Sequence, residues 1–463
     1  MLDFLIVSAW IAEATAWAAL RAVQVQLAIA ANLLCAAMAG AAASRPPRSL
    51  LRLVDARQNG GRLKAMAESA QVLRVRAPRI AGKEDNFTVV VAAPLSPNES
   101  GGPASHLRWL VKEAQENAPH ARLGIVGFWE VRHLPAGVRH LAYLVRLLRG
   151  SKDASLLYAL DPLSVGVPAM VVSRARGVPL VLRVPGDFAW EQGMLRKQVA
   201  DDVETFAKCA WRQAPLGVRV RAWLERKVAQ TATLVIVPSK FVARLVEDWG
   251  VPPERVHVVP SVARASEPSG NKAALRAVMG IEGPLFIAVG RLVPWKHFDA
   301  AVRAVRLVRR KAPKARLIIV GEGPERSSLK ELARKEGVKD AVQFAGALPA
   351  DTTHRYIEAA DALVLPSSYE GLSHTLLEAM ALGTLVIASR AGGNAELVEE
   401  GKHGFLVPPG DPRALAAAMS RILALPHEAR ESMAAAARAR AREVTHESKA
   451  ASRIFALWQE VLH

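Results

Sequence analysis

The chain has 463 residues, of which 51% are hydrophobic, so it can bury a sizeable core and is not a wholly disordered protein. Its formal net charge of +18 favours an anionic partner. Nucleic acid is disfavoured as that partner, because the chain has neither zinc-finger spacing nor an aromatic RNA-binding motif. Two cysteines, Cys35 and Cys209, are too few for a disulfide framework or a zinc site, and they fit a reducing, cytoplasmic compartment.

Residues 1–85 are predicted to form a helical, basic extension ahead of the first strand. Residues 22–44 carry no charge and are roughly long enough to span a bilayer, but alanine dominates them. Residues 45–80 carry nine basic residues against two acidic ones, a pattern that binds anionic lipid head groups. Three interpretations stay open: a membrane anchor, an interfacial helix, and an appendage that does not touch lipid. The expected location is cytoplasmic, with attachment to the inner face of the cytoplasmic membrane as the other possibility.

Short apolar runs separated by long connections follow the extension. The first, at 87–93, is followed by a loop with Gly101 and Gly102 and then by a helix from about 104 to 117. Paired glycines let a backbone approach a ligand closely. Further buried strands are predicted at 155–159, 179–184, 234–237 and 256–259. Connections of this length predict crossover helices and a parallel, doubly wound sheet.

A second set of strands begins after residues 261–275, which are rich in Ser, Pro, Gly and Asn and are predicted to be a linker. The strand at 285–290 ends at Gly290 and is followed by Arg291 and Lys296, and then by an amphipathic helix to about 310. Arginine offers a bidentate fork and lysine a compact charge, so the two together can hold one diphosphate.

The next two predicted strands bear on whether the chain binds NAD and on where the base of a nucleotide would lie. The strand that ends near Val320 leads into Gly321-x-Gly323, but no third glycine follows at the required spacing, so an NAD site is disfavoured. The strand at 342–346 contains Phe344.

The segment from Ser367 to Gly383 places two carboxylates beside a strand-to-helix junction. A buried strand is predicted at 362–366, and a helix runs from Ser373 to Gly383, a good C-terminal cap. Glu370 then lies in the loop, and Glu378 lies one to two turns into the helix. Free backbone amides around Gly371, Leu372 and Ser373 can hold an anion. A site for a nucleotide-sugar requires carboxylates that bind the hydroxyl groups and backbone amides that bind the phosphates.

These segments together resemble the retaining glycosyltransferases of family 4 (group 1), which have the two-domain GT-B fold. The resemblance covers roughly residues 86–460 and is strongest from 286 to 411. It implies an α/β protein with two Rossmann-like domains facing across a cleft, preceded here by the extension. The implied domains are an acceptor-side domain at 86–265, a nucleotide-sugar-binding domain at 276–430, and helices at 431–463 that return to the first domain.

The resemblance also implies roles for individual residues. Arg291 and Lys296 would stabilise the departing nucleoside diphosphate, and Glu370 would position the donor sugar, so these three are the predicted catalytic residues. Glu378 would accept hydrogen bonds from the ribose, and the backbone near Phe344 would lie beside the base. The predicted donor-binding residues are Gly101, Gly102, Gly290, Phe344, Gly371, Leu372, Ser373 and Glu378. No metal and no cofactor are expected, and the donor is of the UDP or GDP type.

Two further carboxylates, Asp187 and Glu191, follow the strand at 179–184. Many relatives carry a His-Asp pair at this place, but here Gly186 stands where the His would be. Asp187 and Glu191 either contact sugar hydroxyls or act as a base on the acceptor, or they cap the loop, and the residues alone do not decide between these roles.

The predicted function is transfer of a sugar, with retention, from a nucleotide-diphosphate sugar to a hydroxyl acceptor, lipid-linked or saccharide, in polysaccharide or glycolipid assembly. One alternative is a GT-B nucleotide-sugar epimerase, which would use the same donor without an acceptor. Another is a non-catalytic basic scaffold on membranes or nucleic acid, which would explain the charge but not the placed glutamates.

Overall fold

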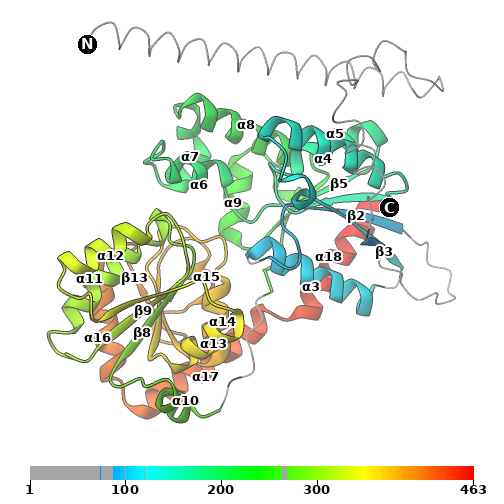
Figure 1. The fold of residues 1–463 in the computed structure, drawn as a ribbon. Coiled ribbons are helices and arrows are strands. Elements are labelled where there is room, and N and C mark those ends of the chain that lie inside the picture. The colour runs from blue at the N-terminus through cyan, green and yellow to red at the C-terminus, as the bar shows by residue number, and fades with distance from the viewer. Residues whose placement is uncertain (1–72, 75–86, 100, 119, 263–267, 269) are drawn as a thin grey trace, which may run out of the picture. The chain divides into compact units, whose positions relative to one another are not determined.

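The computed structural model describes residues 73–463 except 75–86, 100, 119, 263–267 and 269 (Figure 1). The predicted basic extension, with its apolar segment at 22–44, therefore lies outside the described residues apart from Leu73 and Arg74. Within the described part of the chain, no helix is both long and apolar enough to cross a membrane. Residues 131–146 belong, with Leu73, to a compact unit separate from the one that holds the rest of the two sheets described below.

The first sheet has seven strands in the order β1-β3-β2-β4-β5-β6-β7. The strands are β1 (Leu73–Arg74), β2 (Phe87–Ala93), β3 (Ala121–Gly127), β4 (Leu156–Ala159), β5 (Leu180–Arg183), β6 (Leu234–Val237) and β7 (Val256–Val258). The helices of this part are α3 (Gly102–Asn117), η1 (Phe128–Val131), α4 (Ala136–Gly150), α5 (Gly166–Arg176), α6 (Phe188–Leu195), α7 (Val203–Lys208), η2 (Ala210–Arg212), α8 (Leu216–Thr231), α9 (Lys240–Asp248) and η3 (Pro253–Arg255). All pairings from β2 to β7 are parallel, as predicted from the long connections.

The second sheet has six parallel strands in the order β10-β9-β8-β11-β12-β13. The strands are β8 (Leu285–Val289), β9 (Arg316–Val320), β10 (Val342–Gly346), β11 (Ala362–Leu365), β12 (Leu385–Ser389) and β13 (Phe405–Val407). Its helices are α10 (Lys272–Val278), η4 (Pro294–Lys296), α11 (Phe298–Val308), α12 (Arg326–Lys335), α13 (Ala350–Ala359), α14 (His374–Leu382), α15 (Asn394–Leu397), α16 (Pro412–Ala424) and α17 (His427–Val444). The doubly wound parallel α/β architecture expected from the sequence is confirmed.

Strand β3 is one of the strands that were not predicted from the sequence. Two glycines, Gly124 and Gly127, lower its intrinsic preference for strand, and Arg122 is exposed within an otherwise buried run. Pairing with β2 along seven residues, from Phe87 with Ala121 onwards, supplies the backbone hydrogen bonds that hold it in the sheet.

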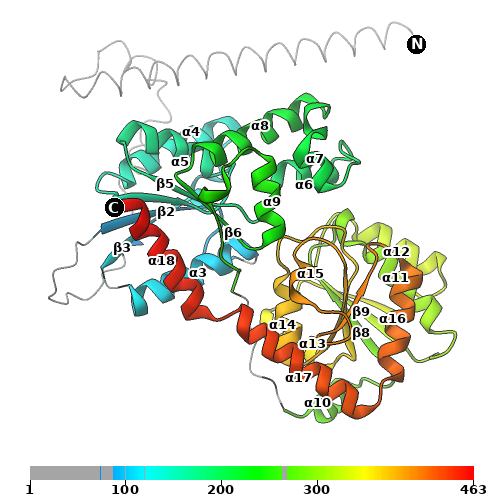
Figure 2. The ribbon, with the colours of Figure 1, turned by 180° about the vertical axis from the view of Figure 1, so that it is seen from behind.

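The last helix, α18 (Glu447–Leu462), joins the core of the first sheet although it follows the second sheet in the chain. Its Ile454 and Trp458 are fully buried there, and the Trp458 ring lies edge-on to Tyr158 of β4 at 5.5 Å. Figures 1 and 2 show α3 and α18 on one face of this sheet and α5 and α8 on the other. The chain therefore crosses back from the second sheet to the first through the α17–α18 junction.

Two predicted boundaries fall inside helices. Helix α10 begins at Lys272, because the side chain of Asn271 accepts a hydrogen bond from the Ala274 N–H and caps it. The helix therefore includes the end of the segment predicted as a linker, and the boundary predicted at 276 falls within it. The boundary predicted at 430 falls within α17, which packs into the core of the second sheet.

Candidate functional site

The residues that directly follow β8 and β9 are in contact at the carboxyl edge of the second sheet. Gly290 has φ +151° and donates its N–H to the Val320 carbonyl at 3.0 Å. Gly321 has φ +136°, and a Cβ at this position would lie 1.9 Å from the Gly290 carbonyl oxygen. Only glycines permit this close approach, which sets the position of Arg291 immediately after it. Ligands of open α/β sheets bind at this edge.

Lys296 and Glu370 form an ion pair at this edge, although they are 74 residues apart in the sequence. Their Nζ and Oε1 atoms are 2.5 Å apart, and the side chains are only 17% and 10% exposed. The Ser367 hydroxyl donates to the same Glu370 oxygen at 2.7 Å, which further orients the carboxylate. The structure thus brings together two of the three predicted catalytic residues, while the third, Arg291, is exposed to solvent.

Helix α14 begins where the sequence predicted, and its amides face the same loop. The Ser373 hydroxyl is its N-cap and accepts the Leu376 N–H at 3.3 Å, and Gly383 ends it in the left-handed conformation. Glu378 lies one turn into the helix, with its Oε2 3.9 Å from Nε2 of His354 on α13. Ser373 is thus committed to capping, and Glu378 is paired with a buried imidazole.

His374, the first residue of α14, is a site residue to which the sequence analysis gave no role. Burial lowers its pKa; the Glu378 carboxylate opposes that shift, and the positive charge of Arg183 adds to it. Glu370 and Lys296 act on the same imidazole with smaller effects. His374 is therefore a neutral imidazole between the two predicted glutamates. Its position in the motif, as the ionisable residue between the two glutamates, is the sequence feature that could have indicated this.

Asp187 serves as the N-cap of α6. Of the roles left open for it, sugar or acceptor contact on one side and loop cap on the other, the structure shows the cap. It is fully buried, and its Oδ1 accepts the Trp190 N–H at 2.8 Å. It forms a buried carboxyl pair with Glu225 of α8, which accepts backbone N–H groups at the start of α6. Burial raises the pKa of both carboxyls, and the Arg226 guanidinium opposes that rise. Asp187 therefore holds the loop rather than facing solvent.

Glu191 is only partly exposed and lies within the electrostatic field of the predicted diphosphate-binding cations. Burial and then the charge of Asp187 raise its pKa to about 7, while Lys296 and Arg291 oppose the rise. Near neutral pH the carboxyl is therefore about half protonated, and it can donate or accept a hydrogen bond.

The Tyr369–Gly371 loop contacts the carboxyl edge of the first sheet. The Tyr369 hydroxyl accepts the Asp187 N–H at 2.8 Å, and a Cβ at Gly371 would lie 2.3 Å from the Pro185 carbonyl oxygen. The Ser239 hydroxyl donates to the Gly371 carbonyl at 2.6 Å. The predicted donor loop is thus held by backbone contacts that no side chain at position 371 would permit.

The remaining predicted donor-binding residues lie on two other elements. Gly101 has φ +123° and precedes α3, which begins at Gly102; a Cβ at Gly102 would meet nothing within 4 Å. Phe344 of β10 is half-buried against the core of the second sheet. The register of β10 shifts between Phe344 and Gly346, so Ala345 has no partner in the ladder. Such a bulge leaves backbone groups available at a strand end.

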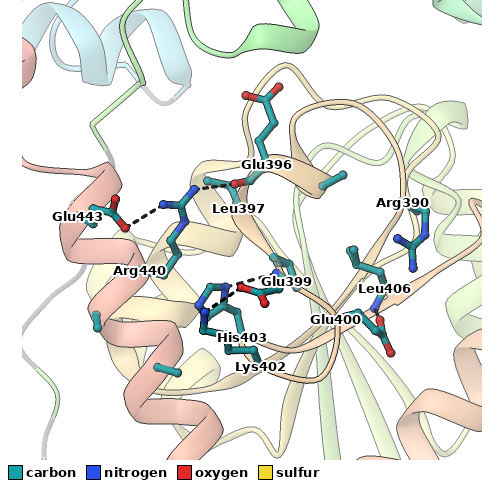
Figure 3. A pocket seen from close by; sticks show the side chains of 14 residues that line it. Arg390, Glu396, Leu397, Glu399, Glu400, Lys402, His403, Leu406, Arg440 and Glu443 are labelled. Atoms are coloured by element: carbon teal, nitrogen blue, oxygen red, sulfur yellow. Dashed lines mark hydrogen bonds and ion pairs between the residues drawn. The ribbon is translucent and has the colours of Figure 1, made fainter.

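A separate cavity of about 720 Å³ lies among α15, the 398–406 segment and α17 (Figure 3). Its charged groups largely neutralise one another: Arg440 lies 2.8 Å from Glu443, and Lys402 lies 2.9 Å from Glu399. No predicted site residue lines it. In the part of the chain that the structure describes, no group of three or more His, Cys, Asp or Glu residues is placed to hold a metal ion.

Comparison with known proteins gives the following likenesses. The family described as "Glycosyl transferases group 1" matches residues 272–440, and "Glycosyl transferase 4-like domain" matches residues 11–261. Over 218 residues the chain is 36% identical to D-inositol 3-phosphate glycosyltransferase of Acidothermus cellulolyticus, covering 43% of this chain and 48% of that protein.

A second relative is the GDP-mannose-dependent alpha-(1-6)-phosphatidylinositol monomannoside mannosyltransferase of Mycolicibacterium smegmatis, 32% identical over 216 residues, with coverage of 44% and 56%. The chain thus spans about half the length of these curated relatives. Among solved structures, Anabaena HepE in complex with UDP has the same fold, with a TM-score of 0.62, 19% identity, and coverage of 81% of this chain and 100% of HepE.

Proposed function

The chain belongs to the 4-like, group 1 glycosyl transferase family and has the GT-B fold, and on this premise we propose that it transfers a sugar from a nucleoside-diphosphate sugar to a hydroxyl acceptor. The reaction retains the anomeric configuration and serves polysaccharide or glycolipid assembly. The observation that carries the proposal is the 2.5 Å ion pair of Lys296 and Glu370 at the carboxyl edge of the second sheet.

In this proposal some residues of this edge stabilise charge, and others orient the donor. Arg291 and Lys296 stabilise the negative charge that develops on the departing diphosphate, which is the principal catalytic task in such a transfer. Glu370, held by Lys296 and Ser367, presents its second oxygen to the donor sugar. Glu378 accepts hydrogen bonds from the ribose, and the first amides of α14 bind phosphate oxygens. No metal and no cofactor take part in this proposal.

The donor is of the UDP or GDP type. HepE was crystallised with UDP, and the mannosyltransferase from M. smegmatis is named as dependent on GDP-mannose. The acceptor is a saccharide or lipid-linked alcohol, in line with the phosphatidylinositol mannoside in the second relative's name. We further propose that the basic residues 45–80 bring the enzyme to an anionic membrane surface, at about 1 kcal/mol for each basic residue in contact.

Titration of the full-length protein with UDP, GDP, ADP and NAD in a calorimeter tests the donor site. We expect micromolar affinity for one nucleoside diphosphate, no binding of NAD, and loss of binding in Arg291→Ala, because that change removes a charge-assisted contact to phosphate. The matched control is Arg310→Ala, which removes an exposed arginine just beyond the end of α11.

Binding that survives in Arg291→Ala would contradict the assigned role of this arginine. No heat with any of the four ligands would favour the basic scaffold, which liposome and DNA binding would then examine. Product analysis separates transfer from epimerisation: an epimerase converts the donor sugar without any acceptor.

Gly102→Ala is expected to leave the melting temperature unchanged or slightly raised while lowering donor affinity about ten-fold. A Cβ at Gly102 meets no atom within 4 Å in the protein, and alanine favours the helix that begins there. A loss of affinity would therefore come from contact between the added Cβ and the ligand, and not from a change in the protein. The same calorimetric titration measures it. Unchanged affinity would remove Gly102 from the donor site.

A further inference from the structure

Arg183 is a buried cation at the carboxyl end of β5. Its side chain lies on the same face as Val181, which packs into the core beneath α3 and α18. The residue is 4% exposed; Nη2 donates to the Ser261 hydroxyl at 2.9 Å, and Nη1 is buried without a hydrogen bond. Nη2 thus has a hydrogen-bond partner and Nη1 has none.

The groups around Arg183 are neutral. Tyr158 and His106 lie beside it, with the tyrosine hydroxyl 3.2 Å from Nε2 of His106. Burial lowers the pKa of His106 and that of His374, and the charge of Arg183 lowers both further. Glu370 and Glu378 act on His374, but among the described residues no carboxylate lies within ion-pair distance of Arg183.

A buried charge is stable only when it is paired or fully hydrogen-bonded. A guanidinium whose Nη1 has no partner can still donate to a phosphate or carboxylate oxygen, and its planar geometry suits such a ligand. Arg183 also ends its strand at the sheet edge where ligands of such folds bind, two residues before Pro185, whose carbonyl abuts the donor loop at Gly371. The amino end of α14, where His374 stands, adds further favourable field for an anion.

We propose that Arg183, together with His106 and His374, binds an anionic oxygen group of the acceptor, either a phosphate or a carboxylate. The inference rests on the proposed transfer reaction and specifies the acceptor as an acidic one. The donor phosphates have their own cations, Arg291 and Lys296, on the second sheet, whereas Arg183 belongs to the first. Arg183 is thus a residue that determines acceptor specificity.

Calorimetric titration with potassium phosphate tests this assignment, with ionic strength held constant by chloride so that screening does not vary. The full-length protein is used as wild type, Arg291→Ala, Arg183→Gln and the double variant. In the Arg291→Ala background, phosphate is expected to bind, and the further change Arg183→Gln is expected to weaken it about ten-fold or more. Affinity for the nucleoside diphosphate is expected to stay within two-fold in Arg183→Gln.

The matched control is Arg226→Gln. Arg226 is also buried, but Nη1 and Nη2 already donate to the carbonyls of Ala222 and Ala207 at 3.0 and 2.9 Å. Phosphate affinity is expected to be unchanged in this variant even if its melting temperature falls. Arg183→Lys keeps the charge without the fork and is expected to bind phosphate at intermediate strength, so it decides the matter if Arg183→Gln does not fold.

Equal phosphate affinity in Arg291→Ala and in the Arg291→Ala/Arg183→Gln double variant would overturn the proposal. An equal loss of nucleotide affinity in Arg183→Gln would also overturn it, because it would place the residue in the donor site. A parallel titration with acetate distinguishes a carboxylate ligand from a phosphate one. The phosphate titration needs no nucleotide, so its failure is separate from a failure of the donor-binding test.

Discussion

Replacing Glu370 by glutamine is expected to lower kcat by about 100-fold or more while donor affinity changes less than three-fold. The carboxylate is held by Lys296 at 2.5 Å and by Ser367 at 2.7 Å, so it is preorganised toward the reacting sugar. Loss of one preorganised electrostatic group commonly costs about 10²–10³ in kcat. Glutamine keeps the shape and removes the charge, and steady-state kinetics with calorimetric measurement of nucleotide affinity separate the two effects.

Glu378→Gln is the matched control, because Glu378 belongs to the same motif but is assigned to the ribose. It is expected to weaken nucleotide binding more than it lowers kcat. Equal losses of turnover and of nucleotide affinity in Glu370→Gln would refute the role given to Glu370.

Gly321→Ala is expected to destabilise the second domain by on the order of 3 kcal/mol and to abolish nucleotide binding. The residue has φ +136°, and the added Cβ would lie 1.9 Å from the Gly290 carbonyl oxygen, which belongs to the backbone and cannot rotate away. Left-handed strain and overpacking each cost about 1–3 kcal/mol. Relief of the clash would displace Gly290 and with it Arg291. Thermal unfolding and nucleotide titration measure the two consequences.

Gly337→Ala isolates the steric part of this effect. Gly337 also has a positive φ, +69°, but a Cβ there meets nothing within 4 Å, so only the conformational strain remains. We expect the melting temperature of Gly337→Ala to lie between those of wild type and Gly321→Ala, with nucleotide affinity kept. Identical melting curves for the two variants would show that the close approach of β8 and β9 does not matter.

The fold was largely predictable from local patterns. The strands at 285–289 and 362–365 are short runs of buried apolar residues between turn signals, and the structure places them within a residue or two of the prediction. Strand β3 was missed because Gly124 and Gly127 hide its preference, and its pairing with β2 is a contact between distant residues. The predicted domain boundaries at 276 and 430 fall inside α10 and α17, because where a helix begins and ends depends on its caps and its packing.

The candidate site was predictable as a set of residue types but not as a geometry. The resemblance singled out Arg291, Lys296 and Glu370, yet the ion pair between the last two joins segments 74 residues apart. The two roles left open for Asp187 differ in whether its carboxylate reaches solvent, and burial, which decides this, comes from α8 packing over α6. The place of His374 in the site also depends on tertiary packing, because the groups that shift its pKa come from elements of both sheets.

The sequence by itself determined the doubly wound α/β class, the two-carboxylate motif and the cations after β8, because propensity and spacing act over neighbouring residues. Only the tertiary structure decided that Lys296 meets Glu370, that Asp187 is buried as a cap, and that Arg183 lies buried with Nη1 unpaired. Burial and electrostatic pairing depend on which distant elements pack together, and no local pattern records that.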